Sequence, residues 1–335
     1  MLRTLVARAL PPRVKWKLVL VQQQLGRRLA GGCIARVLKP ILLRGYLARP
    51  EEIDIEVTSS CDADCIMCPR RAMRRNPGPM PMPLFRKIVD EAIALGVRDL
   101  VLNGYGEIAT LRNYRDYLAY IRERSRSVRI LVNTNGMRMD EELAAAFIKY
   151  GVDVVNVAVD GATAETFERI RKHLKLETVE ANVHRLLAMR KAARRNRPFV
   201  MVHMILQPEN GHETELFLAK WTGVADHAGF AGMLSRAGAI PVQIRNRPSQ
   251  KFPCFLLWRQ MPVLSDGTVA MCCDDWDGRA ALGNLNTHSI REVWRDSQQR
   301  QAARTLHLQG RRDEIDLCAG CEAPRRPPWW FPAQS

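Results

Sequence analysis

The 335-residue sequence contains no run of 18 or more apolar residues, so no segment has the length and hydropathy of a transmembrane helix. It also lacks, near its first residues, a compact apolar segment followed by a small-residue cleavage site, and we expect no secretory leader. The expected setting is therefore the reducing cytoplasm, where clustered cysteines act as metal ligands more often than as disulfides. A chain of this length can build a large apolar core without cross-links.

Acidic residues are missing from the first 50 positions, which contain eleven Lys or Arg and supply most of the formal net charge of +16. Apolar residues recur there at three- or four-residue spacing, which predicts a basic amphipathic helix. One function of such a helix is docking, either on a partner or peripherally on the inner membrane surface. The alternative is that it packs on the main domain with a solvated basic face. The segment is also similar to an organellar transit peptide, although it is poor in serine. It has no series of stacking aromatics or base-reading motif, which argues against nucleic acid as a partner.

Strand-like apolar runs alternate with helical stretches through the first two thirds of the chain. The predicted strands are 53–58, 99–104, 128–133, 152–159, 199–206 and 226–232, and the predicted helices are 83–95, 112–124, 139–150, 163–172, 178–195 and 212–222. Six such units predict an α/β fold with a parallel sheet, either open or curled into a partial (β/α)6 TIM-like barrel. In these folds the chemistry lies at the carboxyl ends of the strands.

The pattern changes after residue 240. Asp266-Gly267 in "PVLSDGTVAMCC" predicts a hairpin, and a helix is expected near 289–305. The predicted domains are a basic helical extension (1–50), a core (51–240), a small C-terminal domain (241–323) and a Pro/aromatic tail (324–335).

Three of the nine cysteines, Cys61, Cys65 and Cys68, form a CxxxCxxC array directly after the first predicted strand. A structural zinc site takes four ligands, and no histidine in this loop could be the fourth. Three thiolates can instead hold three irons of a four-iron four-sulfur (4Fe-4S) cluster and leave the fourth iron open. Zinc ligands or incidental thiols are the alternative.

The array and the segments that follow it resemble the radical S-adenosylmethionine superfamily. "LVLNGYGEIATL" resembles the family's glycine-glutamate motif, with Gly104, Gly106 and Glu107 at the matching positions, although Ile108 replaces the usual proline. Glycines let the backbone approach the methionine moiety, and a carboxylate can accept from its ammonium group.

Other segments match the family in part. "VNTNG" resembles the segment that meets the ribose, through Asn133 and Asn135, and the Arg after "VAVDG", Arg171, would face the methionine carboxylate. Met67 stands where the family often has an aromatic residue that contacts adenine through its backbone, and Ala158 stands where a serine often helps to hold the cofactor. By resemblance, the reduced cluster cleaves S-adenosylmethionine to a 5′-deoxyadenosyl radical that abstracts a substrate hydrogen, with flavodoxin or ferredoxin as reductant.

A second set of four cysteines, Cys254, Cys272, Cys318 and Cys321, could hold one more 4Fe-4S cluster. "LSDGTVAMCC" and its surroundings resemble the SPASM and twitch extensions of the superfamily, which carry auxiliary clusters, and the spacing is nearest to the single-cluster twitch form. Cys273 could replace Cys272 as a ligand, and a four-cysteine zinc site is the alternative to the cluster.

An auxiliary cluster offers an acceptor for an electron from the substrate. This favours oxidation of an alcohol or amine carbon in a polar small molecule, such as a sugar, aminocyclitol, nucleoside or a phosphorylated or lipid-linked derivative. The alternatives are a redox-neutral epimerase, decarboxylase or carbon bond-forming enzyme, a SPASM-type maturase of ribosomal peptides, and a cluster-bearing electron carrier.

Four further residues are candidates for contact with the substrate. Glu56 on the first predicted strand could bind substrate hydroxyls, and His203 on the fifth could accept a proton, or both could be structural residues, with Glu56 paired to an arginine. Arg236 and Arg245 follow the sixth strand and suit phosphate or carboxylate groups, or are solvated surface charges.

Overall fold

The computed structural model describes residues 44–75, 78–236, 239–240 and 253–321. The predicted basic helix, Arg245 and the predicted C-terminal tail therefore lie outside the described residues, apart from a helical turn at 44–48. Within the described part of the chain, no helix is long and apolar enough to cross a membrane.

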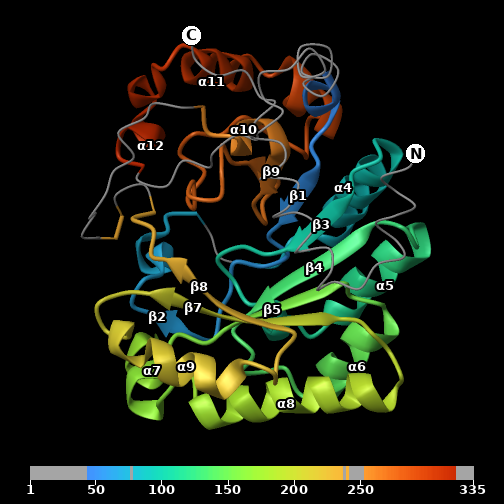
Figure 1. The fold of residues 1–335 in the computed structure, drawn as a ribbon. Helices are drawn as coiled ribbons and strands as arrows, with labels where there is room; N and C mark the ends of the chain where they lie inside the picture. Colours follow the sequence, from blue (N-terminus) through green and yellow to red (C-terminus); the bar gives the residue numbers. More distant parts are fainter. Residues whose placement is uncertain (1–43, 76–77, 237–238, 241–252, 322–335) are drawn as a thin grey trace, which may run out of the picture.

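Six parallel strands form the core of the sheet, in the order β1-β3-β4-β5-β7-β8. They are β1 (Glu52–Ile55), β3 (Asp99–Leu102), β4 (Arg129–Thr134), β5 (Val154–Ala158), β7 (Phe199–Leu206) and β8 (His227–Gly232). The helices are α4 (Met82–Ala94), α5 (Tyr114–Arg124), α6 (Glu141–Lys149), α7 (Ala164–Ile170), α8 (Leu176–Ala192) and α9 (Thr214–Trp221). The predicted series of six strands and six helices is confirmed, and Figure 1 shows α6, α7, α8 and α9 along one side of the strands.

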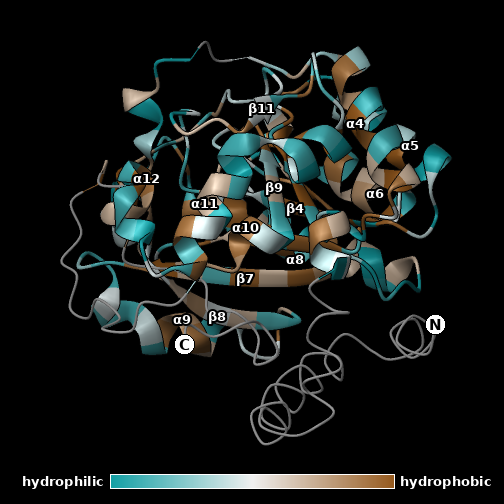
Figure 2. Cartoon of the chain, turned by 90° about the horizontal axis from the view of Figure 1, so that it is seen from above, coloured by the Kyte–Doolittle hydropathy of each residue, from teal (hydrophilic) through white to brown (hydrophobic). Residues whose placement is uncertain are grey.

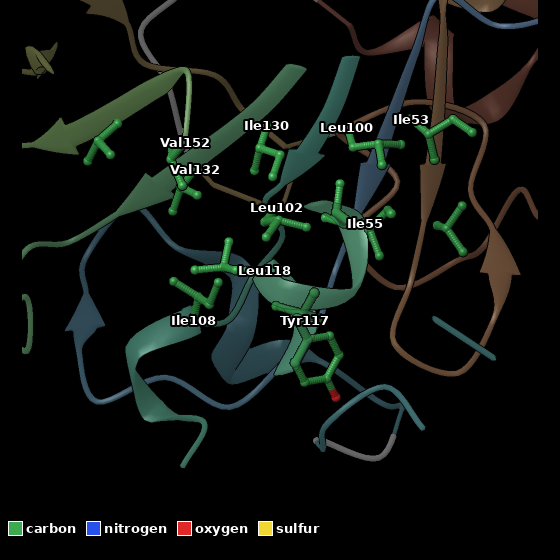
Figure 3. Close-up of a cluster of buried hydrophobic side chains, with 14 of the residues drawn as sticks. Ile53, Ile55, Leu100, Leu102, Ile108, Tyr117, Leu118, Ile130, Val132 and Val152 are labelled. Carbon is green, nitrogen blue, oxygen red and sulfur yellow. The ribbon is translucent and has the colours of Figure 1, made fainter. Parts of the chain in front are cut away.

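The apolar core lies between the strands and these helices. Figure 3 shows side chains of β1, β3 and β4, among them Ile55, Leu102 and Ile130, near Tyr117 and Leu118 of α5. In Figure 2 the helices carry both hydrophobic and hydrophilic residues, as expected for helices with one buried face.

The two faces of the sheet differ in burial. Buried and half-buried residues alternate along β4 and β5 and in the middle of β7. The buried residues belong to the core that includes the helices, so the half-buried residues lie on the opposite, less covered face. Asn133, Asn156 and His203 are on this half-buried face.

The sheet continues into the C-terminal region. Strand β9 (Gln260–Val263) pairs parallel to β1, and β10 (Thr268–Val269) and β11 (Gly283–Asn284) complete a nine-stranded sheet. The predicted hairpin is confirmed, with Gly267 in the left-handed region at φ 88°. One sheet therefore spans the predicted domain boundary at residue 240.

Two predicted helices differ in the structure. The helix expected at 163–172 ends at Ile170, because Arg171 and Lys172 form the short strand β6, which pairs with β2 (Asp64–Cys65). The helix expected near 289–305 is a π-helical turn followed by α11 (Gln298–Leu308). The break falls at Ser297, whose side chain caps α11 by accepting from the Arg300 N–H. Two further short α-helices are α10 (Leu256–Arg259) and α12 (Asp316–Ala319).

Candidate active site

The loop with the first three cysteines lies at the carboxyl end of β1. Pairing of Cys65 with Arg171 ties the loop to the end of α7, and the Ile66 N–H donates to the Ile170 carbonyl at 3.0 Å. The Cys68 N–H donates back to the Cys65 carbonyl at 3.0 Å, which forms a tight turn between the second and third thiols. The CxxxCxxC loop thus has a defined backbone at the edge of the sheet where the fold predicts chemistry.

Burial dominates the electrostatics of these thiols. It raises the pKa of Cys61 to about 12 and also raises the pKa of Cys65, on which the nearby Arg171 cation has the opposite effect. Arg171 Nη1 lies 3.7 Å from Cys65 Sγ as a hydrogen-bond donor. Such a donor suits a thiolate that binds metal, because thiolate ligands accept hydrogen bonds from their surroundings.

Among the residues that the structure describes, no three His, Cys, Asp or Glu side chains already converge as metal ligands. The donor chemistry of the loop still fits an iron-sulfur cluster with one open iron: three thiols from one loop and a guanidinium aimed at one of them.

The glycine-glutamate segment packs directly against this loop. A Cβ on Gly106 would meet the Thr58 carbonyl oxygen at 2.1 Å, and one on Gly104 would meet Glu56 Cγ at 2.4 Å. In the structure, both glycines thus permit close contact with the segment directly after β1. The Glu107 N–H donates to the Ser60 carbonyl at 2.8 Å, directly before Cys61.

Glu107 is buried at the ends of β3 and β4. Its carboxylate accepts from Thr134 Oγ1 at 2.7 Å, from the Asn135 N–H at 2.7 Å and from the Ala109 N–H at 3.2 Å. Burial raises its pKa to about 7 in spite of these three donors. A nearby cation such as an ammonium group would stabilise the charged form of this carboxylate. The environment of Glu107 is therefore compatible with the predicted contact to the ammonium group of the cofactor.

Asn135 connects the end of β4 to the cysteine loop. Its Nδ2 donates to Asp62 Oδ1 at 2.8 Å, and Arg138 Nε donates to Asp62 Oδ2 at 2.9 Å. The loop is therefore held from both the β4 end and the α7 end. Met67, in the same loop, is buried.

Arg171 is bound to a fully buried carboxylate. Its Nε and Nη2 both lie 2.7 Å from Asp160 Oδ2, while Asp160 Oδ1 accepts from the Ile205 N–H at 2.6 Å. This ion pair fixes the guanidinium beside Cys65. A contact between Arg171 and the methionine carboxylate remains a prediction.

A polar ladder crosses the half-buried face of the sheet. Asn156 Nδ2 donates to Asn133 Oδ1 at 3.1 Å, and Asn156 Oδ1 lies 2.8 Å from His203 Nδ1. Because the amide oxygen accepts, Nδ1 carries the ring proton and Nε2 keeps its lone pair. Burial lowers the pKa of His203, so the ring is neutral near pH 7.

Glu56 has a different environment from the one expected for a substrate-binding group. Its two oxygens lie 2.5 and 2.7 Å from Arg75 Nη1 and Nη2, and they also accept from the Tyr105 and Ser265 N–H groups. Both members of the ion pair are almost fully buried. These contacts favour the structural alternative, a carboxylate that joins β1 to the segments after β3 and β9.

The second cysteine set gathers from three separate segments. Burial raises the pKa of Cys272, and it raises the pKa of Cys318 to about 12. Repulsion from Cys254 raises the pKa of both thiols further. Cys321 has the same effect on Cys318. The four thiols are thus electrostatic neighbours, and burial together with mutual repulsion is a setting that a cationic metal centre relieves.

The segment around Cys272 covers the carboxyl edge of the core sheet. Tyr105 Oη donates to the Cys273 carbonyl at 2.5 Å, and Arg75 Nε donates to the Trp276 carbonyl at 3.0 Å. Arg236, predicted to contact substrate, is half-buried and lies 2.9 Å from Asp274 Oδ1. The predicted substrate contact of Arg236 therefore competes with an existing ion pair.

Several site residues were missed by sequence analysis. Asn156 and Asp160 have a sequence signal, since both are polar residues in or directly after an apolar strand. Arg75 and Tyr105 have none, because their partners come from distant segments.

These features define an α/β protein with a cluster-binding loop at the carboxyl edge of its sheet and a second cysteine set beside it. Two family models match the chain, the Radical SAM superfamily over residues 55–220 and the SPASM iron-sulfur cluster-binding domain over residues 254–322. The chain belongs to the radical SAM superfamily and carries a C-terminal SPASM domain. Its cofactors are S-adenosylmethionine, the radical SAM 4Fe-4S cluster and an auxiliary iron-sulfur cluster.

Curated relatives are distant. The chain is 24% identical over 157 residues to the tungsten-containing aldehyde ferredoxin oxidoreductase cofactor-modifying protein of Pyrococcus furiosus, a match that covers 47% of this chain and 44% of that protein. It is 20% identical over 271 residues to the S-adenosyl-L-methionine-dependent 2-deoxy-scyllo-inosamine dehydrogenase of Niallia circulans, which covers 80% of this chain and 91% of the dehydrogenase. The chain thus spans less than half of the first relative and most of the second.

Solved structures share the fold. BtrN in complex with AdoMet and 2-DOIA matches with a TM-score of 0.57 and 17% identity, over 82% of this chain and 93% of BtrN. Streptococcus suis SuiB bound to the precursor peptide SuiA matches with a TM-score of 0.64 and 12% identity, over 77% of this chain and 67% of SuiB. At these identities the likeness shows the fold alone.

Proposed function

We propose that this radical SAM enzyme oxidises an alcohol or amine carbon of a polar small molecule and passes the electron to its auxiliary cluster. The substrate class is a sugar, aminocyclitol or nucleoside, free or as a phosphorylated or lipid-linked derivative. The observation that carries the proposal is the hydrogen bond from Tyr105 Oη to the Cys273 carbonyl. Tyr105 lies between Gly104 and Gly106 of the predicted cofactor segment, and Cys273 is next to Cys272, so an electron acceptor held by Cys272 would lie close to that segment.

His203 is the best-placed proton acceptor for this reaction. Its Nε2 has the lone pair, its ring is neutral, and it lies on the half-buried face of the sheet with Asn156 fixing the tautomer. Oxidation of an alcohol requires loss of one hydrogen atom, one proton and one electron. The hydroxyl proton would go to Nε2 of His203, while the cofactor radical and the auxiliary cluster, when bound, would take up the hydrogen atom and the electron.

Cys61, Cys65 and Cys68 would hold the cluster that, with S-adenosylmethionine bound, would supply the hydrogen-abstracting radical. The protein groups around it orient the cofactor. In this proposal Glu107 would accept from the ammonium group, and Asn135 would keep the loop in place through its hydrogen bond to Asp62. A flavodoxin or ferredoxin in the cytoplasm is the proposed electron donor to this cluster.

The test is an anaerobic reaction of the reconstituted enzyme with S-adenosylmethionine, a reductant and a panel of sugars, aminocyclitols and nucleosides, each free and phosphorylated. We expect 5′-deoxyadenosine and a carbonyl product in equal amounts for at least one substrate. With that substrate, His203→Gln should slow carbonyl formation by about 10²-fold or more, as for loss of a general base, while exposed His212→Gln should not. An epimerised or decarboxylated product, or activity on peptides only, would contradict the proposal.

A further inference from the structure

His307 connects two of the predicted ligands of the auxiliary cluster. It lies in α11, is 1% exposed, and its Nδ1 accepts from the Cys254 N–H at 3.1 Å. On the other side of the ring, Nε2 lies 3.5 Å from Cys318 Sγ. One side chain therefore contacts the backbone of the first cysteine and the sulfur of the third.

The contact at Nδ1 fixes the direction of the contact at Nε2. A backbone N–H can only donate, so Nδ1 must present its lone pair to Cys254. A neutral imidazole has one ring proton, and an imidazolium has no acceptor nitrogen. The proton is therefore on Nε2, and the ring donates an N–H···S hydrogen bond to Cys318.

We propose that His307 is a positioning residue of the auxiliary cluster. By donating a hydrogen bond to the Cys318 thiolate, the His307 ring raises the reduction potential of this cluster. The inference rests on the assignment of Cys254, Cys272, Cys318 and Cys321 as the cluster ligands. Reduction adds negative charge that spreads onto the cysteine sulfurs, so a donor to sulfur stabilises the reduced form more than the oxidised form. This makes the cluster a better electron acceptor, as the proposed oxidation requires.

The two contacts of the ring can be separated by substitution. In His307→Gln the amide nitrogen can take the place of Nε2 and still donate to Cys318, while the acceptor for Cys254 is lost. In His307→Asn the shorter side chain can keep an acceptor for the Cys254 N–H but does not reach the sulfur. A role limited to holding the backbone predicts the opposite ranking of these two variants from a role at the sulfur.

The experiment is a redox titration followed by electron paramagnetic resonance, in the full chain with Cys61, Cys65 and Cys68 changed to Ala, so that only the auxiliary cluster is observed. We expect His307→Gln to keep the parent potential. His307→Asn should lower the equilibrium constant for reduction about tenfold, which is about 59 mV for one electron. His212→Asn, at an exposed histidine, is the matched control and should have no effect.

Three results would overturn the inference. One is a parent-like potential in His307→Asn with its iron content unchanged. The second is evidence that the ring has a purely structural role. That evidence would be a shift of the reduction potential in His307→Gln but not in His307→Asn, or loss of iron from both variants. The third is a parent protein that holds no cluster at the second cysteine set. That result refutes the ligand assignment as well, whereas the first two leave the proposed oxidation and its ligands intact.

Discussion

Removal of the Arg75 cation should destabilise the protein strongly, because Glu56 would remain buried without its counter-ion. The side chains of Glu56 and Arg75 are 2% and 8% exposed and make two parallel contacts of 2.5 and 2.7 Å. Breaking such a pair from one side typically costs about 3–5 kcal/mol. Since the Tyr105 and Ser265 N–H groups still donate to the carboxylate, we expect Arg75→Met to cost about 3 kcal/mol, the lower end of that range.

A double variant and a surface variant make the comparison specific. Glu56→Gln with Arg75→Met removes both charges and should recover at least about half of the loss, since replacement of a buried pair by neutral groups is often tolerated. Arg115→Met breaks the exposed pair with Glu142, whose side chains are 49% and 73% exposed, and should cost less than about 1 kcal/mol.

The assay is urea unfolding of the metal-free full chain under anaerobic conditions, followed by tryptophan fluorescence, with midpoints compared at equal slope. An Arg75→Met variant as stable as Arg115→Met would refute the structural role of Glu56. In that case the carboxylate would again be a candidate for contact with substrate hydroxyls.

Two further predictions concern the glycine-glutamate segment. Gly106→Ala forces the new Cβ against the Thr58 carbonyl, so it should lower the free energy of unfolding by about 1–3 kcal/mol and reduce the iron bound at the adjacent cysteine loop. The control Gly211→Ala, with nothing within 4 Å of its Cβ, should change neither quantity. Equal effects of the two variants in urea unfolding and iron analysis would contradict this prediction. The native pKa of Glu107, about 7, lies above its ordinary value of 4.5. Between these pH values the native state therefore binds more protons than the unfolded state. The free energy of unfolding should fall by about 3 kcal/mol as the pH rises through this window. Glu107→Gln should remove this decrease when unfolding midpoints are measured between about pH 5 and pH 8, and a variant with the pH dependence of the parent would show that another group titrates.

The core of the fold follows from sequence patterns, because apolar strand runs and amphipathic helices alternate regularly. The C-terminal strand β9 does not, since "QMPV" is four residues long, contains a proline and pairs with β1 some 200 positions earlier. The end of α7 also differs from the prediction, because the last two predicted helical residues, Arg171 and Lys172, pair with β2 instead. Tertiary pairing thus decides where short segments with weak local preference belong.

The candidate site shows the same division. Motif spacing and the family resemblance predicted both cysteine sets and Glu107, because the first array and the glycine-glutamate segment are short sequence motifs and the second set follows the pattern of the SPASM and twitch extensions. The partners that set their environment come from elsewhere: Arg75 for Glu56, and His307 for Cys254 and Cys318. Helical periodicity could place His307 on the buried face of a helix, but only the packed structure shows that its ring faces two cysteines.

If the chain holds two clusters on two separate cysteine sets, its iron and sulfide content should fall by half when either set is removed. The native protein, reconstituted anaerobically, should hold about eight irons and eight sulfides per chain, as two 4Fe-4S clusters require. Changing Cys61, Cys65 and Cys68 to Ala should leave about four of each, and so should changing Cys254, Cys272, Cys318 and Cys321, while Cys273→Ala should keep about eight. A second set that retains zinc in place of iron, or a triple variant that retains all of its iron, would contradict the assignment of two clusters.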